Sequence, residues 1–212
     1  INGTEFVQTQ GTSTFYAVGI TSPATIPVLS YNTTGVGGTV DVGVTASYAY
    51  RNSFTTHVSA PSVPSVLIGT STTNTALVIT HEASSQTGVD GIVFFISEDG
   101  GDQRYLYVDS NGDPVVQLNT TGTTAISLGS LSSLDTLTPE PLYNLLPPQD
   151  AYYMFQWRDR ICLLDFRADA DRWPFVQYSG LESVYIGVPQ ESYPPLNLLQ
   201  IAAKGDKARS GI

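Results

Sequence analysis

The hydrophobic residues of this chain recur mainly at every second position, in short runs that turn residues interrupt. Residues 39–52 show this most clearly, because Val40, Val42 and Val44 alternate with polar or small neighbours and Tyr48 and Tyr50 continue the same period. A period of two is that of a β-strand, and no long segment has the helical period. With abundant Thr, Val, Gly and Pro, the pattern predicts an all-β protein.

Short predicted strands are spaced regularly over the first two thirds of the chain. Residues 1–21 form two strand-like pieces, which we interpret as an N-terminal strand segment. Residues 22–128 hold strands at 26–31, 39–52 and 75–82 and a hairpin with a second turn over 91–118. This spacing predicts an immunoglobulin-like or fibronectin III-like β-sandwich of about 100 residues.

The last third of the chain changes character twice. Residues 129–150 contain four prolines and scattered leucines, so we expect an extended connector without a regular strand, with one helical turn near 130–137. Residues 151–212 return to short β-like runs, at 152–166, 175–180, 183–189 and 196–202. They predict a second, small β-region, either incomplete in itself or completed by neighbouring subunits.

Charge separates the two parts. Residues 1–150 carry two basic and twelve acidic side chains, whereas residues 151–212 carry seven of each. A strongly acidic first part argues against direct nucleic-acid binding. No apolar run approaches the ~18 residues of a membrane span, so none is expected. The basic residues begin abruptly at the sequence Trp157-Arg158-Asp159-Arg160.

Three pieces, taken in order, resemble a known architecture. "SYAYRNSFTTHVSAPSVPS" resembles a fibronectin type III strand that runs into Ser-Ala-Pro-Ser, and residues 88–110 resemble a later strand pair of such domains. "YYMFQWRDRICLLDF", with "VQYSG" and "YPPLN" after it, resembles the first blade-like segment of a β-propeller. The combination resembles head-to-tail or tail proteins of tailed bacteriophages. It implies a non-enzymatic structural subunit, located in a virion or extracellular assembly, whose partners are copies of itself or other virion subunits.

The arginine-rich stretch allows two interpretations. Residues 152–166 form either a strand pair or one long strand. Read as one strand, they place Trp157, Asp159, Ile161 and Leu163 on one face and Arg158, Arg160 and Cys162 on the other. The arginines would then lie on an exposed face, with Asp159 paired to one of them. Alternatively the stretch anchors a neighbouring subunit, because Trp and Arg are enriched at interface hot spots. The interface candidates are Trp157, Arg158, Arg160, Trp173 and Tyr178.

Catalytic and metal-binding motifs are weak. The chain has no phosphate-binding Gly-rich loop, dinucleotide fingerprint or nucleophile elbow, so we predict neither an enzyme nor a cofactor. Asp109, Asn111 and Asp113 resemble the opening of a calcium loop, but the later ligands of such a loop are missing, so we prefer a simple turn and keep calcium as the weaker alternative. The single cysteine, Cys162, is expected to be a buried apolar residue.

Two other functions remain open. A secreted carbohydrate-binding or cell-surface-binding module would use the late aromatic residues as a stacking platform. A hydrolase fragment would place His57 or His81 in a cleft with a serine and a carboxylate. Asn-x-Thr sequons at Asn2, Asn32 and Asn119 would matter in a host that glycosylates secreted proteins.

Overall fold

The computed structural model describes residues 7–10, 14–32, 43–71, 76–97, 100–126, 134–148, 151–166, 175–180 and 192–201. All regular structure in these ranges is β, as the alternating pattern predicts. The chain divides into two compact units. One consists of Ile1–Thr21, Phe54–Val58 and Tyr143–Ile212, and the other of Ser22–Ser53 and Ser59–Leu142. We call them the terminal unit and the sandwich unit.

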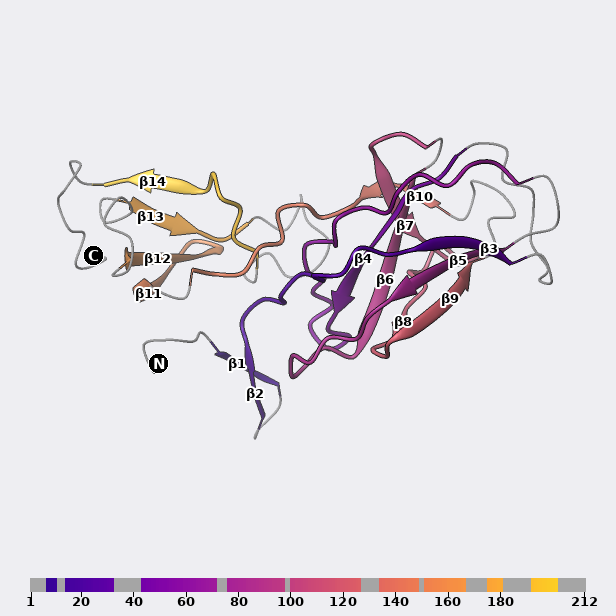
Figure 1. The fold of residues 1–212 in the computed structure, drawn as a ribbon. Coiled ribbons are helices and arrows are strands. Elements are labelled where there is room, and N and C mark those ends of the chain that lie inside the picture. The colour runs from indigo at the N-terminus through magenta and orange to yellow at the C-terminus, as the bar shows by residue number, and fades with distance from the viewer. Residues whose placement is uncertain are drawn as a thin grey trace. The chain divides into compact units, whose positions relative to one another are not determined.

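The sandwich unit contains two antiparallel sheets (Figure 1). In the larger sheet, four strands lie in the order β10-β7-β6-β4 and β8 also pairs with β6; in the smaller sheet the order is β3-β5-β9. The larger sheet comprises β4 (Ala46–Arg51), β6 (Gly91–Ser97), β7 (Arg104–Tyr107), β8 (Gln117–Leu118) and β10 (Leu134–Pro139). The smaller one comprises β3 (Leu29–Asn32), β5 (Ala76–His81) and β9 (Gly122–Ile126).

Aromatic contacts join the two sheets face to face. The ring of His81 on β5 lies 6.3 Å from that of Tyr48 on β4 and 5.6 Å from that of Phe94 on β6, measured between centroids. All seven residues of β6 are buried, as expected for a central strand covered on both faces. The unit is therefore an all-β sandwich with its core between β4, β5 and β6.

One strand contradicts our expectation for residues 129–150. We predicted no regular strand there, and a helical turn near 130–137, but Leu134–Pro139 forms β10. This strand pairs only with β7, and its register shifts between Asp135 and Pro139. Proline is tolerated on an edge strand because its missing N–H faces away from the ladder. The proline-containing segment therefore forms the edge strand of the larger sheet.

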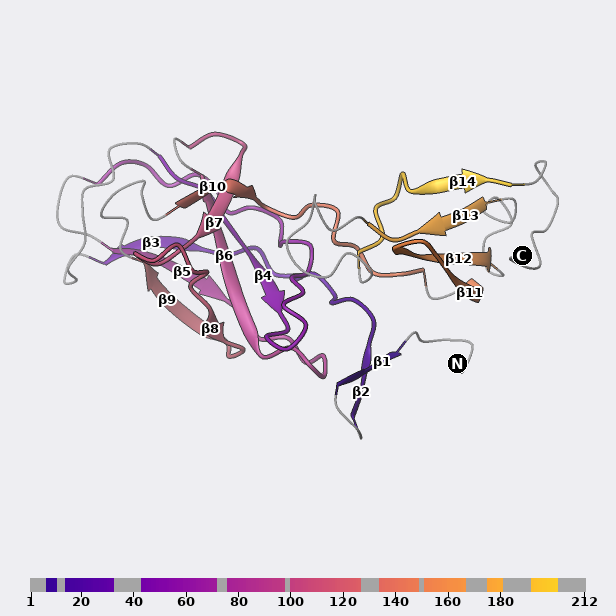
Figure 2. The same cartoon turned by 180° about the vertical axis from the view of Figure 1, so that it is seen from behind.

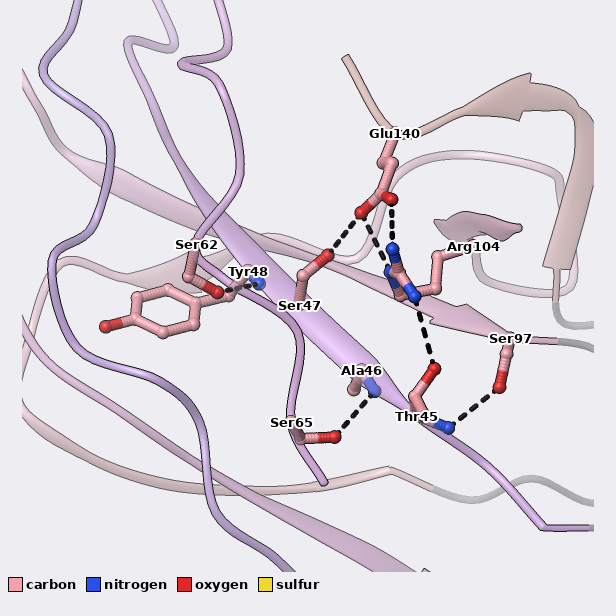
Figure 3. A network of polar contacts seen from close by, with 9 residues as sticks. All are labelled: Thr45, Ala46, Ser47, Tyr48, Ser62, Ser65, Ser97, Arg104 and Glu140. Carbon is pink, nitrogen blue, oxygen red and sulfur yellow. Dashed lines mark hydrogen bonds and ion pairs between the residues drawn. The ribbon is translucent and has the colours of Figure 1, made fainter. Parts of the chain in front are cut away.

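A serine repeat covers the outer edge of β4. The N–H groups of Ser59, Ser62 and Ser65 donate to the carbonyls of Tyr50, Tyr48 and Ala46, at 2.8–2.9 Å. In return, the N–H groups of those three β4 residues donate to the serine Oγ atoms, at 3.0–3.2 Å. Figure 3 shows these bonds for Ser62 and Ser65. Three residues of this ladder segment, residues 59–68, thus match two residues of the strand.

The ladder ends on a backbone pair. Ile68, three residues after Ser65, exchanges both backbone hydrogen bonds with Val44 at 3.0 Å. A repeat of three residues is the period of polyproline II, which suits the sequence Ser-Ala-Pro-Ser-Val-Pro-Ser. Proline has no N–H to donate, and Pro61 and Pro64 stand between the rungs, where the ladder requires no donor.

A buried ion pair fixes the end of β10. Arg104 Nη2 lies 2.5 Å from Glu140 Oε1, and Arg104 Nε donates to Oε2 at 2.9 Å. Ser47 Oγ donates to the same Oε2 at 2.8 Å, and Arg104 Nη1 donates to Thr45 Oγ1 at 3.3 Å (Figure 3). The two charged groups are thus paired as well as bonded to neighbouring hydroxyls, as buried charges require.

The terminal unit contains a hairpin and a four-stranded sheet. The hairpin pairs β1 (Val7–Gln10) with β2 (Thr14–Ala17), in agreement with the strand-like pieces predicted in residues 1–21. The sheet follows chain order, β11-β12-β13-β14, with every neighbouring pair antiparallel (Figure 2). Its strands are β11 (Ala151–Trp157), β12 (Arg160–Phe166), β13 (Phe175–Tyr178) and β14 (Leu198–Gln200).

Candidate interaction surface

The arginine-rich stretch is a tight hairpin, so of our two readings the strand pair is confirmed and the alternation along one long strand is wrong. Trp157 and Arg160 are directly paired across β11 and β12, so Arg158 and Asp159 form the two-residue turn. Arg158 has a φ of +54°, which L-residues other than Gly, Asn and Asp seldom adopt. The turn reverses the chain and places Trp157 and Arg160 on the same face, because cross-strand partners share a face.

The two arginines stack on aromatic rings instead of pairing with Asp159. The guanidinium carbon of Arg158 lies 4.9 Å from the centroid of the Trp157 ring, and that of Arg160 lies 4.7 Å from the Tyr178 ring. Arg160 Nη1 also donates to the Ser179 carbonyl at 2.7 Å. The two arginines therefore differ: Arg160 is built into the sheet, whereas Arg158 is exposed beside an exposed Trp157.

One face of the four-stranded sheet, which we call the aromatic face, carries mainly apolar side chains together with Arg160. Its centre is a buried cluster of Cys162, Leu164 and Val176, against which Phe155 and Tyr178 pack. Its outer strands carry exposed apolar side chains: Tyr153 and Trp157 on β11, and Leu199 on β14. Trp157 and Leu199 each retain 54% of their accessible surface.

The opposite face carries its own apolar cluster. Leu163, adjacent to Leu164 in sequence, packs there with Ala151, Phe166 and Tyr193, and Val18 and Ile161 lie against them. Leu163 and Leu164 are both fully buried. Each face of the sheet therefore has a buried apolar cluster at its centre, although this second face also carries Gln156 and Gln177, the cross-strand partners of Ile161 and Leu163.

The remaining interface and thiol predictions have mixed outcomes. Trp173 lies outside the described residues. Tyr178 lies on the aromatic face in contact with Arg160. Cys162 is buried, as expected, and burial raises the pKa of its thiol while the nearby Arg160 charge opposes that rise. A thiol in this state is an apolar packing group rather than a nucleophile.

The suspected calcium loop is a hydrogen-bonded turn. Asp109 Oδ1 accepts from the N–H groups of Asn111 and Asp113, at 2.8 and 3.0 Å, and these bonds hold the pKa of Asp109 below its ordinary value. Asp113 O accepts from the Asp109 N–H at 2.8 Å, and Gly112 has a φ of +84°. Within the described ranges no three His, Cys, Asp or Glu side chains gather in a metal-binding group.

The two histidines are buried in different units, His57 in the terminal unit and His81 in the sandwich unit. His81 Nε2 lies 2.9 Å from Thr124 Oγ1 on β9. Burial lowers the pKa of His81, against a smaller opposing effect of the Thr120 backbone. Its ring serves as a neutral link in the core, since its ring contacts are Tyr48 and Phe94.

Asn119 is a structural residue. Its Nδ2 donates to the carbonyls of Ser84 and Val89, and its Oδ1 accepts from the Ser84 N–H, at 2.8–3.0 Å. Glycan attachment there would remove an Nδ2 hydrogen that the fold uses. Of the other sequons, Asn2 lies outside the described residues, and Asn32 ends β3 in an exposed position.

Sequence reasoning missed the aliphatic part of the exposed surface. Met154, Leu199 and Ile201 are all more than two-fifths exposed in the terminal unit. The runs "YYMF" and "LLQI" were visible, but we read them only as parts of strands and assigned no exposed surface to them. Because Met154 and Leu199 lie on the two outer strands, only the pairing order distinguishes them from core residues.

Comparisons with protein-family models, curated proteins and solved structures found no match. Among the described residues, no helix is long and apolar enough to span a membrane.

Proposed function

We propose that this chain is a non-enzymatic structural subunit of a virion, of the head-to-tail or tail kind, or of a similar extracellular assembly. The single observation that carries the proposal is the four-stranded sheet of the terminal unit. Each of its faces has a buried apolar cluster, and its outer strands present Tyr153, Met154, Trp157 and Leu199 to solvent. Such surface is typical of protein–protein interfaces.

The strand order agrees with the blade-like resemblance. An antiparallel meander of four strands in chain order, β11 to β14, is the topology of a propeller blade. A blade packs against neighbours through both faces. In this chain the centre of each face is already buried at Leu163 and Leu164, and the exposed side chains of the outer strands are left for a neighbour. The proposal therefore needs a neighbouring layer, whether from another subunit or from another protein of the assembly.

The arginine contacts favour a protein partner over a glycan. A sugar-binding platform presents several open ring faces side by side, whereas a guanidinium lies over one face of the Trp157 ring and of the Tyr178 ring, and Tyr178 also packs against the buried cluster. Trp and Arg together are the composition of interface hot spots. The carbohydrate-binding alternative thus has less support in the side-chain arrangement.

The test is co-sedimentation of the protein with particles from its source. Material is separated on a density gradient, washed at high salt and probed for this chain. The proposal predicts that the chain sediments with particles at a fixed ratio to their other proteins. Recovery only in the soluble fractions, together with binding to a glycan array that W157S abolishes, would overturn it.

A further inference from the structure

We propose that copies of this chain bind head to tail, with the apolar ridge of one sandwich unit seated on the Trp157 hairpin of the next copy. The ridge consists of Val63, Val66 and Leu67, and the Trp157 hairpin consists of residues 157–160. This inference rests on the proposed assembly function and names one contact through which that function operates.

The serine ladder forces the ridge outward. Ser62 and Ser65 direct both their N–H and Oγ toward β4 and are buried. Of the residues between the rungs, Ala60 is buried, whereas three later apolar side chains are exposed. Val63 is 61%, Val66 85% and Leu67 55% exposed. A proline-containing segment of this period is the kind of ligand that aromatic-lined surfaces bind, since its backbone is already extended and rigid.

A hairpin with an acidic sequence borders the ridge. The β6–β7 hairpin lies against its end, because a Cβ placed on Gly100 would lie 3.2 Å from Leu67 Cδ1. This hairpin has the sequence Glu-Asp-Gly-Gly-Asp, and its Asp102 is exposed. The sandwich unit as a whole holds ten acidic and two basic residues, a net charge of −8, and one of the two basic residues, Arg104, is neutralised by Glu140.

The Trp157 hairpin offers the complementary arrangement. Trp157 gives an exposed ring, and Arg158, stacked beside it, gives an exposed positive charge that no described carboxylate neutralises. An apolar ridge beside an acidic hairpin therefore matches an aromatic ring beside an arginine. Opposite charges placed next to an apolar contact fix its register and speed association.

The two surfaces lie on different parts of the chain, so the contact is heterologous. Such contacts propagate into closed rings or open filaments, whereas a two-fold symmetric contact stops at a dimer. This distinction provides the test, because each copy carries one ridge and one Trp157 hairpin, which can be disabled separately.

The experiment compares W157S, V66D and their equimolar mixture by light scattering after size exclusion. Each variant alone is expected to be monomeric, since one half of every contact is lost. The mixture is expected to give dimers and no larger species, because the intact ridge of W157S fits the intact hairpin of V66D. L137S, which alters a side chain that is 90% exposed on β10, is the matched control and keeps the wild-type mass.

Three results would overturn the inference. They are a wild-type mass in either single variant, a mixture that remains monomeric, and a wild-type chain that is itself monomeric at all concentrations. Because the proposed function is judged separately by co-sedimentation with particles, a chain that sediments with particles yet fails the mixing test would contradict only this contact. Circular dichroism of each variant checks that the fold is retained.

Discussion

Ser62 and Tyr48 exchange two hydrogen bonds, but only one of the two joins backbone atoms on both sides. The Ser62 N–H donates to the Tyr48 carbonyl at 2.8 Å, while the Tyr48 N–H donates to Ser62 Oγ at 3.2 Å. The serine hydroxyl thus takes the place of a carbonyl on the edge of a sheet. This substitution lets a proline-containing segment cover β4 and satisfy its buried N–H groups.

Removal of one such hydroxyl should destabilise the sandwich. S62A leaves the buried Tyr48 N–H without its acceptor, which costs about 1–3 kcal/mol in the free energy of unfolding. Urea denaturation measures the loss. S110A, at an exposed position in the Asp109 turn, is the control and should change stability by less than about 0.5 kcal/mol. Equal stability of the two variants would contradict the role of the ladder.

The Arg104–Glu140 pair should be costly to break on one side only. E140A leaves a buried guanidinium unpaired, and such changes typically cost about 3–5 kcal/mol. The double variant R104M/E140L removes both charges and should recover most of that loss, because an apolar pair has no desolvation penalty. Denaturant midpoints of the three proteins test this. A double variant as unstable as E140A would show that Arg104 acts through other contacts.

His81 should make the sandwich less stable in mild acid. Its folded-state pKa lies below the ordinary 6.5, so between those values the unfolded chain binds more protons and the unfolding free energy rises with pH. The contribution is complete above pH 6.5 and is lost as the pH falls through the lowered value. In the unmodified protein, this effect should make the unfolding free energy rise by up to about 1.4 kcal/mol per pH unit between pH 5 and 7.5. The H81Q variant should lose this contribution to the pH dependence. An unchanged slope in H81Q, with H57Q as the comparison, would contradict this.

Arg158 should prove more important for association than for folding. Its φ of +54° carries strain that glycine relieves, and relief of this kind is worth about 1 kcal/mol. R158G also loses the stacking on Trp157, about 0.5–1 kcal/mol at an exposed site. Thermal unfolding should therefore change little, while self-association weakens. T56G, at the other described non-glycine residue with positive φ, tests strain relief away from the hairpin.

The alternation of apolar residues predicted the strands well, since Tyr48, Tyr50 and their neighbours must alternate to cover a core. It did not predict the turn at Arg158 and Asp159, because a two-residue hairpin normally announces itself with Gly or Asn at the strained position. It also missed β10, where the pairing of Arg104 with Glu140 secures an edge that its prolines seemed to forbid. Both errors arise from tertiary contacts that overrule local preference.

The two faces of the four-stranded sheet could not be predicted from the sequence either. Leu163 and Leu164 are neighbours in sequence and equally apolar, and a single strand gives no sign that both faces are covered. Trp157 and Arg160 were selected as interface candidates by residue type alone. Alternation along one strand would place them on opposite faces, whereas the hairpin pairs them directly and so places them on the same face.

The central claim is that this chain works by assembling with other subunits. Its most direct test is the native mass of the unmodified protein, measured by size exclusion with light scattering over a wide concentration range. The account predicts defined multiples of 22.7 kDa that W157S reduces. A stable 22.7 kDa monomer at every concentration, with no other subunit bound, would contradict it.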